Sequence, residues 1–145
     1  MALHDHVSLK DRLQAVGFRV TQSRLAVATC LEDAHRPLGT PDLAKALVPK
    51  DLDLATLYRT LASFEEQGLI RRVNIDPRFA AYEWVEDETS HHHHLVCQRC
   101  GLIEEIPECD LSDLEKTVLK DSKRFRTISS HSLEFFGVCK NCQKA

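Results

Sequence analysis

Two pairs of cysteines, each spaced by two residues, constrain this sequence more than any other feature: Cys97 with Cys100, and Cys139 with Cys142. A CxxC turn directs two thiolates toward one ion, and two such turns supply the four ligands of a tetrahedral zinc site. The gap of 38 residues between the pairs is longer than in a compact zinc ribbon, so a whole subdomain must fold between them. Redox-active pairs and buried free cysteines are the alternatives for the same spacing.

The composition, 43% hydrophobic and 28% charged, is that of a soluble globular protein. No apolar run approaches the roughly 18 residues of a membrane span, and the N-terminus lacks the pattern of a secretory signal. We therefore expect a cytoplasmic protein without membrane association, whose thiols stay reduced and able to bind metal. A formal net charge of −3 excludes coating of nucleic acid by bulk positive charge, so any DNA contact needs a local patch.

The first half of the sequence is punctuated as a series of helices. Four predicted helices begin at residues whose side chains cap helix N-termini, namely Ser8, Thr21, Thr40 and Asp53. The first ends before Gly17, the third near Leu47 before Pro49, and the fourth before Gly68. The fourth carries an apolar face at helical spacing, made of Leu54, Leu57, Leu61 and Phe64.

After the fourth helix the hydrophobic period changes. Residues 69–73 and 80–84 are predicted to be two strands joined around Asp76-Pro77. Helices followed by such a hairpin favour a winged helix-turn-helix. We therefore predict an α+β fold with a winged-helix domain over residues 1–85 and a polar, acidic hinge over residues 86–90.

Residues 91–145 are predicted to form a second, zinc-containing domain. Strands are expected around the first CxxC turn, then a helix over residues 111–125, then a strand over residues 131–139 that leads into the second CxxC turn.

Four consecutive histidines, His91 to His94, precede the first CxxC pair. Successive side chains of a strand point to opposite faces, so His92 and His94 share one face while His91 and His93 share the other. This geometry offers two imidazole pairs to two different metal sites, and a surface histidine run without a role is the alternative. Further residues with suitable ligand chemistry are His35, Glu83, Glu105, Asp113 and His131.

The N-terminal end of the fourth helix is the candidate DNA reader, because recognition helices meet base edges there. Thr56, Tyr58 and Arg59 lie at this end. Phosphate contacts are expected from three residues at the start of the second helix, Arg19, Thr21 and Arg24. A helix that merely packs against its neighbours is the alternative.

Four motifs in the same order resemble the ferric uptake regulator family: LxxxGFRVTxxR, DLATLYRTLxxFEEQGLI, HHHHLVCQRCGLIEEI and HSLEFFGVCKNC. The resemblance covers roughly residues 9–142. Similar proteins are dimeric, metal-dependent bacterial transcription factors with an N-terminal winged helix and a C-terminal α/β dimerisation domain. The resemblance therefore implies a homodimer that binds a palindromic operator in double-stranded DNA and represses genes of metal uptake and homeostasis.

The resemblance also implies three metal sites. The structural zinc ligands are Cys97, Cys100, Cys139 and Cys142. A sensing site for a second divalent metal comprises His35, Glu83, His92, His94 and Glu105, although His35 lies two residues before the family's usual position, which Pro37 occupies. A further site comprises His91, His93, Asp113 and His131.

The sensed metal is expected to be zinc rather than iron. Iron-sensing relatives often have an aspartate where this chain has His93, and imidazole suits zinc well. Manganese sensing and peroxide sensing are alternatives within the family. From other classes, a zinc enzyme or an interaction module without a DNA role would explain the clusters, but no HExxH motif or nucleophile elbow supports an enzyme, so we predict none.

Overall fold

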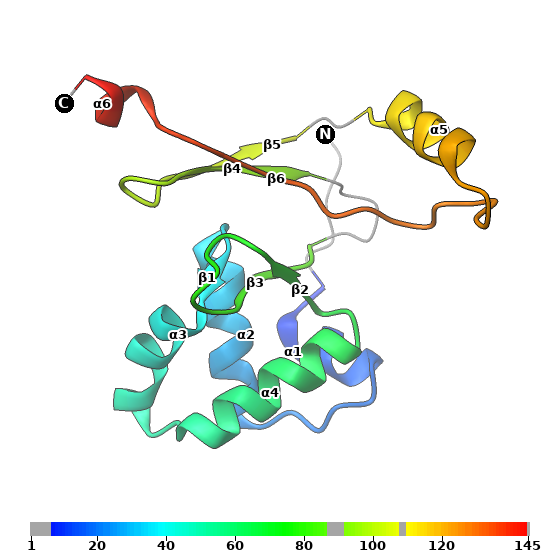
Figure 1. Cartoon of the computed structure of the whole chain (residues 1–145). Coiled ribbons are helices and arrows are strands. Elements are labelled where there is room, and N and C mark those ends of the chain that lie inside the picture. The colour runs from blue at the N-terminus through cyan, green and yellow to red at the C-terminus, as the bar shows by residue number, and fades with distance from the viewer. Residues whose placement is uncertain (1–6, 87–91, 108–109, 145) are drawn as a thin grey trace, which may run out of the picture. The chain divides into compact units, whose positions relative to one another are not determined.

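The structure, a computed structural model, describes residues 7–86, 92–107 and 110–144. It divides into two compact units, residues 1–86 and 87–145, and each is described by itself. The N-terminal unit combines helices with a small sheet, and the C-terminal unit contains a second sheet with two helices (Figure 1). Residues 87–90 of the predicted hinge lie outside the described residues.

Helices make up most of the N-terminal unit: α1 (Leu9–Ala15), α2 (Gln22–Ala34), α3 (Thr40–Leu47), the 3₁₀ turn η1 (Val48–Lys50) and α4 (Leu54–Glu66). Three of the four predicted caps are confirmed, because the side chains of Ser8, Thr21 and Asp53 each accept a hydrogen bond from a first-turn N–H. Gly68 follows the end of α4 with a φ of +71°, a left-handed conformation that favours glycine.

The prediction that Thr40 caps the third helix is wrong. Gly39 occupies the N-cap position and Thr40 is the first helical residue. The Thr40 N–H donates to the carbonyl of Ala80, 2.9 Å away, which ties the start of the helix to the chain before β3. A Cβ atom on Gly39 would lie 2.5 Å from the Phe79 ring, so any other residue here would force that ring to shift.

The sheet of the N-terminal unit has the order β1-β3-β2, with every pair antiparallel. Its strands are β1 (Leu38–Gly39), β2 (Ile70–Val73) and β3 (Ala81–Trp84). The predicted hairpin is confirmed as β2 and β3. We did not predict β1, because two residues are too few to show an alternating pattern.

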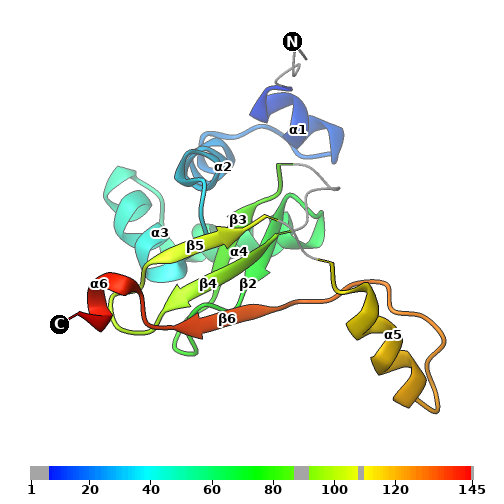
Figure 2. The same ribbon diagram turned by 90° about the horizontal axis from the view of Figure 1, so that it is seen from above.

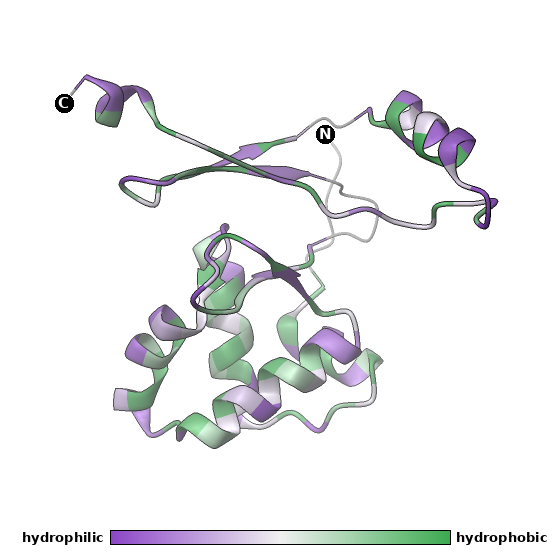
Figure 3. Cartoon of the chain, viewed as in Figure 1, coloured by the Kyte–Doolittle hydropathy of each residue, from purple (hydrophilic) through white to green (hydrophobic). Residues whose placement is uncertain are grey.

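The helices and the hairpin enclose one hydrophobic core. Figure 3 shows the apolar residues gathered on α2 and α4, and Leu57, Leu61 and Phe64 are at most 1% exposed. Leu54 was predicted on the same face but is 49% exposed. It is the first residue of α4, one position after the cap.

The C-terminal unit contains β4 (His93–Cys97), β5 (Ile103–Ile106), α5 (Ser112–Asp121), β6 (Glu134–Gly137) and α6 (Lys140–Gln143). Its strand order is β5-β4-β6, with β4 antiparallel to β5 and parallel to β6. The helix predicted to reach residue 125 ends earlier, because Ser122 is extended and its Oγ accepts from the N–H groups of Arg124 and Phe125. In Figure 2, α5 stands away from this sheet.

Candidate metal centres and nucleic-acid interface

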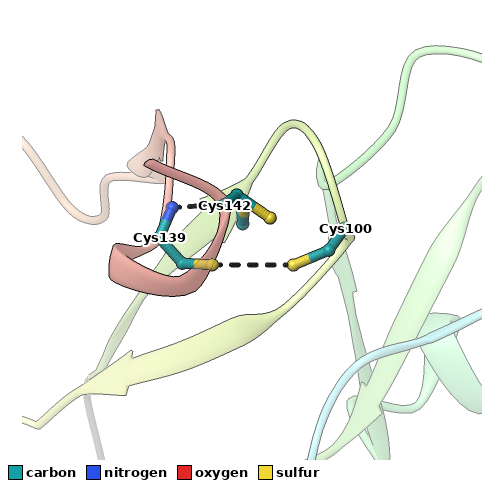
Figure 4. Close-up of side chains that lie close together, drawn as sticks. Cys100, Cys139 and Cys142 are labelled. Atoms are coloured by element: carbon teal, nitrogen blue, oxygen red, sulfur yellow. Dashed lines mark hydrogen bonds between the residues drawn. The ribbon is translucent and has the colours of Figure 1, made fainter. Parts of the chain in front are cut away.

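The structure brings the four predicted zinc cysteines together at one end of the C-terminal sheet. One Sγ atom from each of Cys97, Cys100, Cys139 and Cys142 lies within 4.8 Å of the others. In Figure 4 the sulfurs of Cys100 and Cys139 face each other across a distance of 3.7 Å. Residues from the two ends of the unit therefore form a single centre.

Backbone hydrogen bonds shape the turns that carry these sulfurs. The Gly101 N–H donates to the Cys97 carbonyl over 2.9 Å, and Gly101 adopts a φ of +75° that closes the first CxxC turn. Cys139 is the N-cap of α6, and its N–H donates to the Cys97 sulfur over 3.3 Å. Each turn thus orients its own cysteines and contacts the other turn.

The thiolate cluster fits a zinc ion. With Zn–S bonds of about 2.3 Å, sulfurs at the corners of a tetrahedron lie about 3.8 Å apart, close to the Cys100–Cys139 distance. The N–H of Cys139 donates to Cys97 and lowers the pKa of its thiol to about 6, which favours the thiolate that a metal needs. Hydrogen bonding first to Cys139 and then to Cys100 raises the pKa of Cys142 to about 12, because several sulfurs crowd one place.

A second set of ligand groups gathers on one face of β4 and β5, with His92 directly before the start of β4. One ligand atom from each of His92, His94 and Glu105 lies within 4.8 Å of the others. The rings of the two histidines are 5.1 Å apart, and His92 Nε2 is 3.5 Å from Glu105 Oε1. His94 is only 3% exposed and pairs with Glu105 across the strands. Two imidazoles and a carboxylate can together bind a divalent ion.

The opposite face of β4 carries His93, as strand alternation requires. His93 Nδ1 donates to the carbonyl of Leu133 over 3.0 Å, and its Nε2 lies 3.4 Å from Nε2 of His131. Glu115 Oε1 accepts from His131 Nδ1 over 2.8 Å. His91, the other histidine assigned to this face, lies outside the described residues.

Asp113 does not join this group in the structure. Its side chain is 97% exposed and pairs with Lys116 over 3.2 Å. Residues two positions apart on a helix are about 200° apart around its axis, so Asp113 and Glu115 point to opposite sides of α5. Glu115 therefore takes the place beside His131 that the sequence prediction gave to Asp113.

Glu83, on β3, belongs to the N-terminal unit. Its side chain is 5% exposed, and Arg71 donates to Oε1 from both Nε and Nη2, over 2.8 Å and 2.6 Å. His35 lies at the C-cap of α2 with a φ of +45°, and its Nδ1 is 3.3 Å from Glu86 Oε1. Both predicted ligands thus lie in this unit, each beside a charged partner.

The six predicted DNA contacts lie around the start of α2 and the start of α4. A surface pocket of about 370 Å³ is lined by four of them, Thr21, Arg24, Thr56 and Arg59, together with Ser23, Thr60 and Ser63. Tyr58 is 52% exposed. Hydroxyls and guanidinium groups at one surface hollow are the donors that contact phosphate oxygens.

The arginines of this surface are held in place by local contacts. Arg24 Nη1 donates to the Arg19 carbonyl over 2.7 Å, and its guanidinium lies 4.7 Å from the centre of the Phe18 ring. Arg59 Nη2 donates to Thr56 Oγ1 over 3.2 Å, and Thr56 Oγ1 in turn donates to Asp53 Oδ2 over 2.6 Å. The surface is therefore organised before any DNA is bound.

Sequence reasoning missed several residues of these sites. Ser63 and Thr60 lie seven and four positions after Thr56, a helical spacing that could have revealed them. Arg71 and Glu115 gave no such signal. The partner of Arg71 depends on the strand register, and that of Glu115 depends on which side of α5 points toward His131.

A winged helix joined to a unit that holds a four-thiolate centre and a histidine–carboxylate cluster defines a metal-responsive DNA-binding regulator. Residues 15–136 match the sequence model of the ferric uptake regulator family. The ferric uptake regulation protein of Bordetella parapertussis is 31% identical over 141 residues, covering 95% of this chain and 99% of that protein. That of Bacillus subtilis is 33% identical over 138 residues, covering 92% and 91%.

A solved structure leads to the same family. The ferric uptake regulator of Francisella tularensis with iron superposes with a TM-score of 0.72 and 29% identity, covering 88% of this chain and 96% of that one. The chain therefore belongs to the ferric uptake regulator family. Proteins of this family are metal-responsive transcriptional regulators, not enzymes; they bind DNA and form dimers. The predicted fold class, a winged-helix DNA-binding domain followed by a dimerisation domain, is confirmed.

Proposed function

We propose that this protein is a cytoplasmic, metal-dependent repressor of metal uptake and homeostasis genes that binds a palindromic operator as a homodimer. The observation that carries the proposal is the pair of chemically different metal centres in the C-terminal unit. One is a cluster of four thiolates, and the other combines two imidazoles with a half-exposed carboxylate. A closed thiolate site suits a permanent structural ion, whereas a mixed site suits an ion that exchanges.

Zinc is proposed for the thiolate centre, held by Cys97, Cys100, Cys139 and Cys142. The sulfur distance supports a tetrahedral ion, and the site joins the two ends of the C-terminal unit. This ion acts as a structural element and takes no part in the response.

The proposed sensing site uses His92, His94 and Glu105 of the C-terminal unit with Glu83 and His35 of the N-terminal unit. A metal bound by residues of both units fixes the angle between them. In a homodimer, that angle sets the distance between the two α4 helices, which must match successive major grooves about 34 Å apart. Metal binding thereby shifts the population of arrangements toward the one that binds DNA.

Zinc is proposed as the sensed metal, ahead of iron and then manganese. His93 next to the sensing residues and the predominance of imidazole favour zinc. The Francisella tularensis relative, in contrast, was solved with iron. The further site predicted from His91, His93, Asp113 and His131 stays a prediction, with Glu115 as the carboxylate now favoured for it.

The test uses full-length protein that retains its tightly held zinc. DNA ligands are enriched from a random-sequence pool with added zinc, and the dissociation constant for the enriched sequence is measured by fluorescence anisotropy. Zinc, ferrous iron under anaerobic conditions, and manganese are compared with a metal-free arm. We expect an enriched sequence with two-fold symmetry and an affinity about 5–150-fold higher with the sensed metal.

Two variants separate the sites. The double variant His92→Ala, His94→Ala should lose the metal response while keeping one zinc per chain, because the cysteine centre is intact. His35→Ala tests the fifth proposed ligand: if His35 binds the metal, this variant should need a higher metal concentration than the wild type for half-maximal DNA binding. DNA binding that is equally strong without metal, or absent under every condition, contradicts the proposed function.

A further inference from the structure

Arg71 and Glu83 form an ion pair that the proposed function does not use. They face each other across β2 and β3 in the strand register. Two nitrogens of the Arg71 guanidinium donate to the same carboxylate oxygen, Oε1, over 2.8 Å and 2.6 Å. The Glu83 side chain is 5% exposed and that of Arg71 is 38% exposed, so the pair lies at the edge of the buried region.

Because the Glu83 carboxylate is buried, its ion pair with Arg71 affects how readily it can bind a metal ion. A carboxylate that has lost most of its water needs a compensating charge and hydrogen bonds, and a guanidinium supplies both. In the metal-free protein the negative charge of Glu83 is therefore already matched by Arg71. An incoming divalent ion must share that carboxylate with a cation or displace it.

We propose that Arg71 lowers the affinity of the sensing site for its metal and so sets the metal concentration at which the protein responds. This inference rests on the proposed role of Glu83 as a ligand. If Arg71 stays on Glu83, its positive charge repels the metal ion; if it leaves, metal binding must break the ion pair. Both routes weaken metal binding, so the sign of the effect does not depend on which one operates.

The direction of the change in metal affinity on removal of Arg71 distinguishes this role from that of a group that orients a metal ligand. Groups that orient metal ligands usually raise affinity, and their loss lowers it roughly 10–100-fold. Removal of Arg71 should do the opposite, because a buried carboxylate without its cation gains more from a metal ion than one already paired.

The chain offers a matched control in Arg72, the next residue of β2. Strand alternation places its side chain on the other face, and Arg72 is exposed and paired in register with Tyr82. Arg72→Gln removes the same charge from the same strand without touching the Arg71–Glu83 pair. This variant therefore shows how much of any change in zinc affinity comes from the loss of one positive charge in general.

The experiment measures zinc affinity of the full-length protein, with the structural zinc retained, by competition with a chromogenic chelator. Arg71→Gln should bind zinc at the sensing site roughly 10-fold more tightly than the wild type, and Arg72→Gln should match the wild type within about 2-fold. Arg71→Thr is a second neutral variant suited to a strand and should show the same gain. Glu83→Gln should weaken binding, and adding Arg71→Gln to it should give a smaller gain than in the wild type, because breaking of the ion pair no longer contributes.

The outcomes separate the two proposals. Unchanged or weaker zinc binding in both neutral Arg71 variants, together with weaker binding in Glu83→Gln, overturns the role of Arg71 and leaves the sensing site in place. Unchanged binding in Glu83→Gln removes Glu83 from the proposed ligands and thereby overturns the role of Arg71, while the metal-dependent DNA binding of the wild type tests the proposed function separately. Melting temperatures of the metal-free proteins give an independent readout: Arg71→Gln should melt lower than Arg72→Gln, because it leaves Glu83 buried without its cation.

Discussion

The N-terminal unit buries its large apolar side chains against one another, whereas the C-terminal unit leaves many of its own in contact with solvent. Phe64 on α4 is 0% exposed, but Phe135 and Phe136 on β6 are 46% and 49% exposed. Among the described residues of the C-terminal unit, only Val96 and Cys97 are buried hydrophobic side chains. Its other large apolar side chains that are exposed are Leu95, Leu102, Leu114, Val118, Phe125 and Val138.

This difference indicates what each unit needs in order to fold. A core built from every helix can stabilise the winged helix by itself. A three-stranded sheet with little buried apolar area needs other sources of stability, and metal binding and association with a second copy are the two that this family provides. We expect a second copy of the chain to cover the exposed apolar side chains of the C-terminal unit. None of the helices in the described residues is long and apolar enough to cross a membrane.

The largest expected effect is the loss of the thiolate centre. Cys139→Ala should abolish the tightly held zinc, and with it a structural contribution that reaches about 10–16 kcal/mol in small zinc domains. Hydrogen exchange followed by mass spectrometry should then show lost protection over β4, β5 and β6 and retained protection in α2 and α4. Cys30→Ala is the control, because Cys30 packs against the N-terminal core and lies outside the cluster. Parallel loss of protection in both units would show that they do not fold separately.

A substitution in the hydrophobic core should instead destabilise the N-terminal unit and leave the zinc centre intact. Phe64→Ala should lower the free energy of unfolding of that unit by about 3–5 kcal/mol, because it leaves a cavity among fully buried side chains. Zinc content should stay at the wild-type level. Leu54→Ala on the same helix, at a position 49% exposed, should cost far less. Denaturant unfolding followed by the fluorescence of Trp84, which contacts Phe64, measures the effect, and equal costs for both variants would contradict it.

Association should depend on the exposed face of the C-terminal sheet. Leu95 is 39% exposed and helps to line a pocket of about 470 Å³ beside the zinc turns. Leu95→Glu would place a charge in that face, and we expect it to weaken dimerisation by about 2 kcal/mol or more. Sedimentation velocity at several concentrations measures the shift from dimer to monomer. Val48→Glu, at a similarly exposed site in the N-terminal unit, is the control and should leave the dimer intact.

The parts of the molecule that the sequence predicted are those that depend on nearby residues. The caps at Ser8, Thr21 and Asp53 need only a side chain and an N–H three positions on. The alternation of His92, His93 and His94 follows from strand geometry, and the CxxC spacing implies a shared ion.

The parts that were missed depend on distant residues. Thr40 is the first helical residue and not the cap, and its N–H donates to the carbonyl of Ala80, forty residues later. Arg71 meets Glu83 only through the register of the hairpin, and Glu115 reaches His131 only through the rotation of α5. A single sequence specifies such pairings through tertiary packing, which local patterns do not report.

The smallest predicted effect concerns Asp53, which caps α4 and holds Thr56 and, through it, Arg59. The Thr56 side chain and then its N–H hold the pKa of Asp53 below its ordinary value of 3.8. A carboxyl whose pKa is lower in the folded state stabilises the protein above its unfolded pKa, and this contribution is lost as the pH falls through the folded pKa. Asp53→Asn should therefore lower the melting temperature slightly at pH 7, and the difference from wild type should shrink as the pH falls below 3.8.

Asp42→Asn removes the same charge from the first turn of α3, where the cap residue makes no side-chain hydrogen bond. It should show a smaller change in melting temperature, which isolates the effect of the cap from that of charge near a helix N-terminus. Asp53→Asn should also weaken DNA binding, since Thr56 and Arg59 lose the carboxylate that positions them, while Asp42→Asn should not. Equal DNA affinity in the two variants would mean that the cap stabilises the helix without organising the DNA-binding surface.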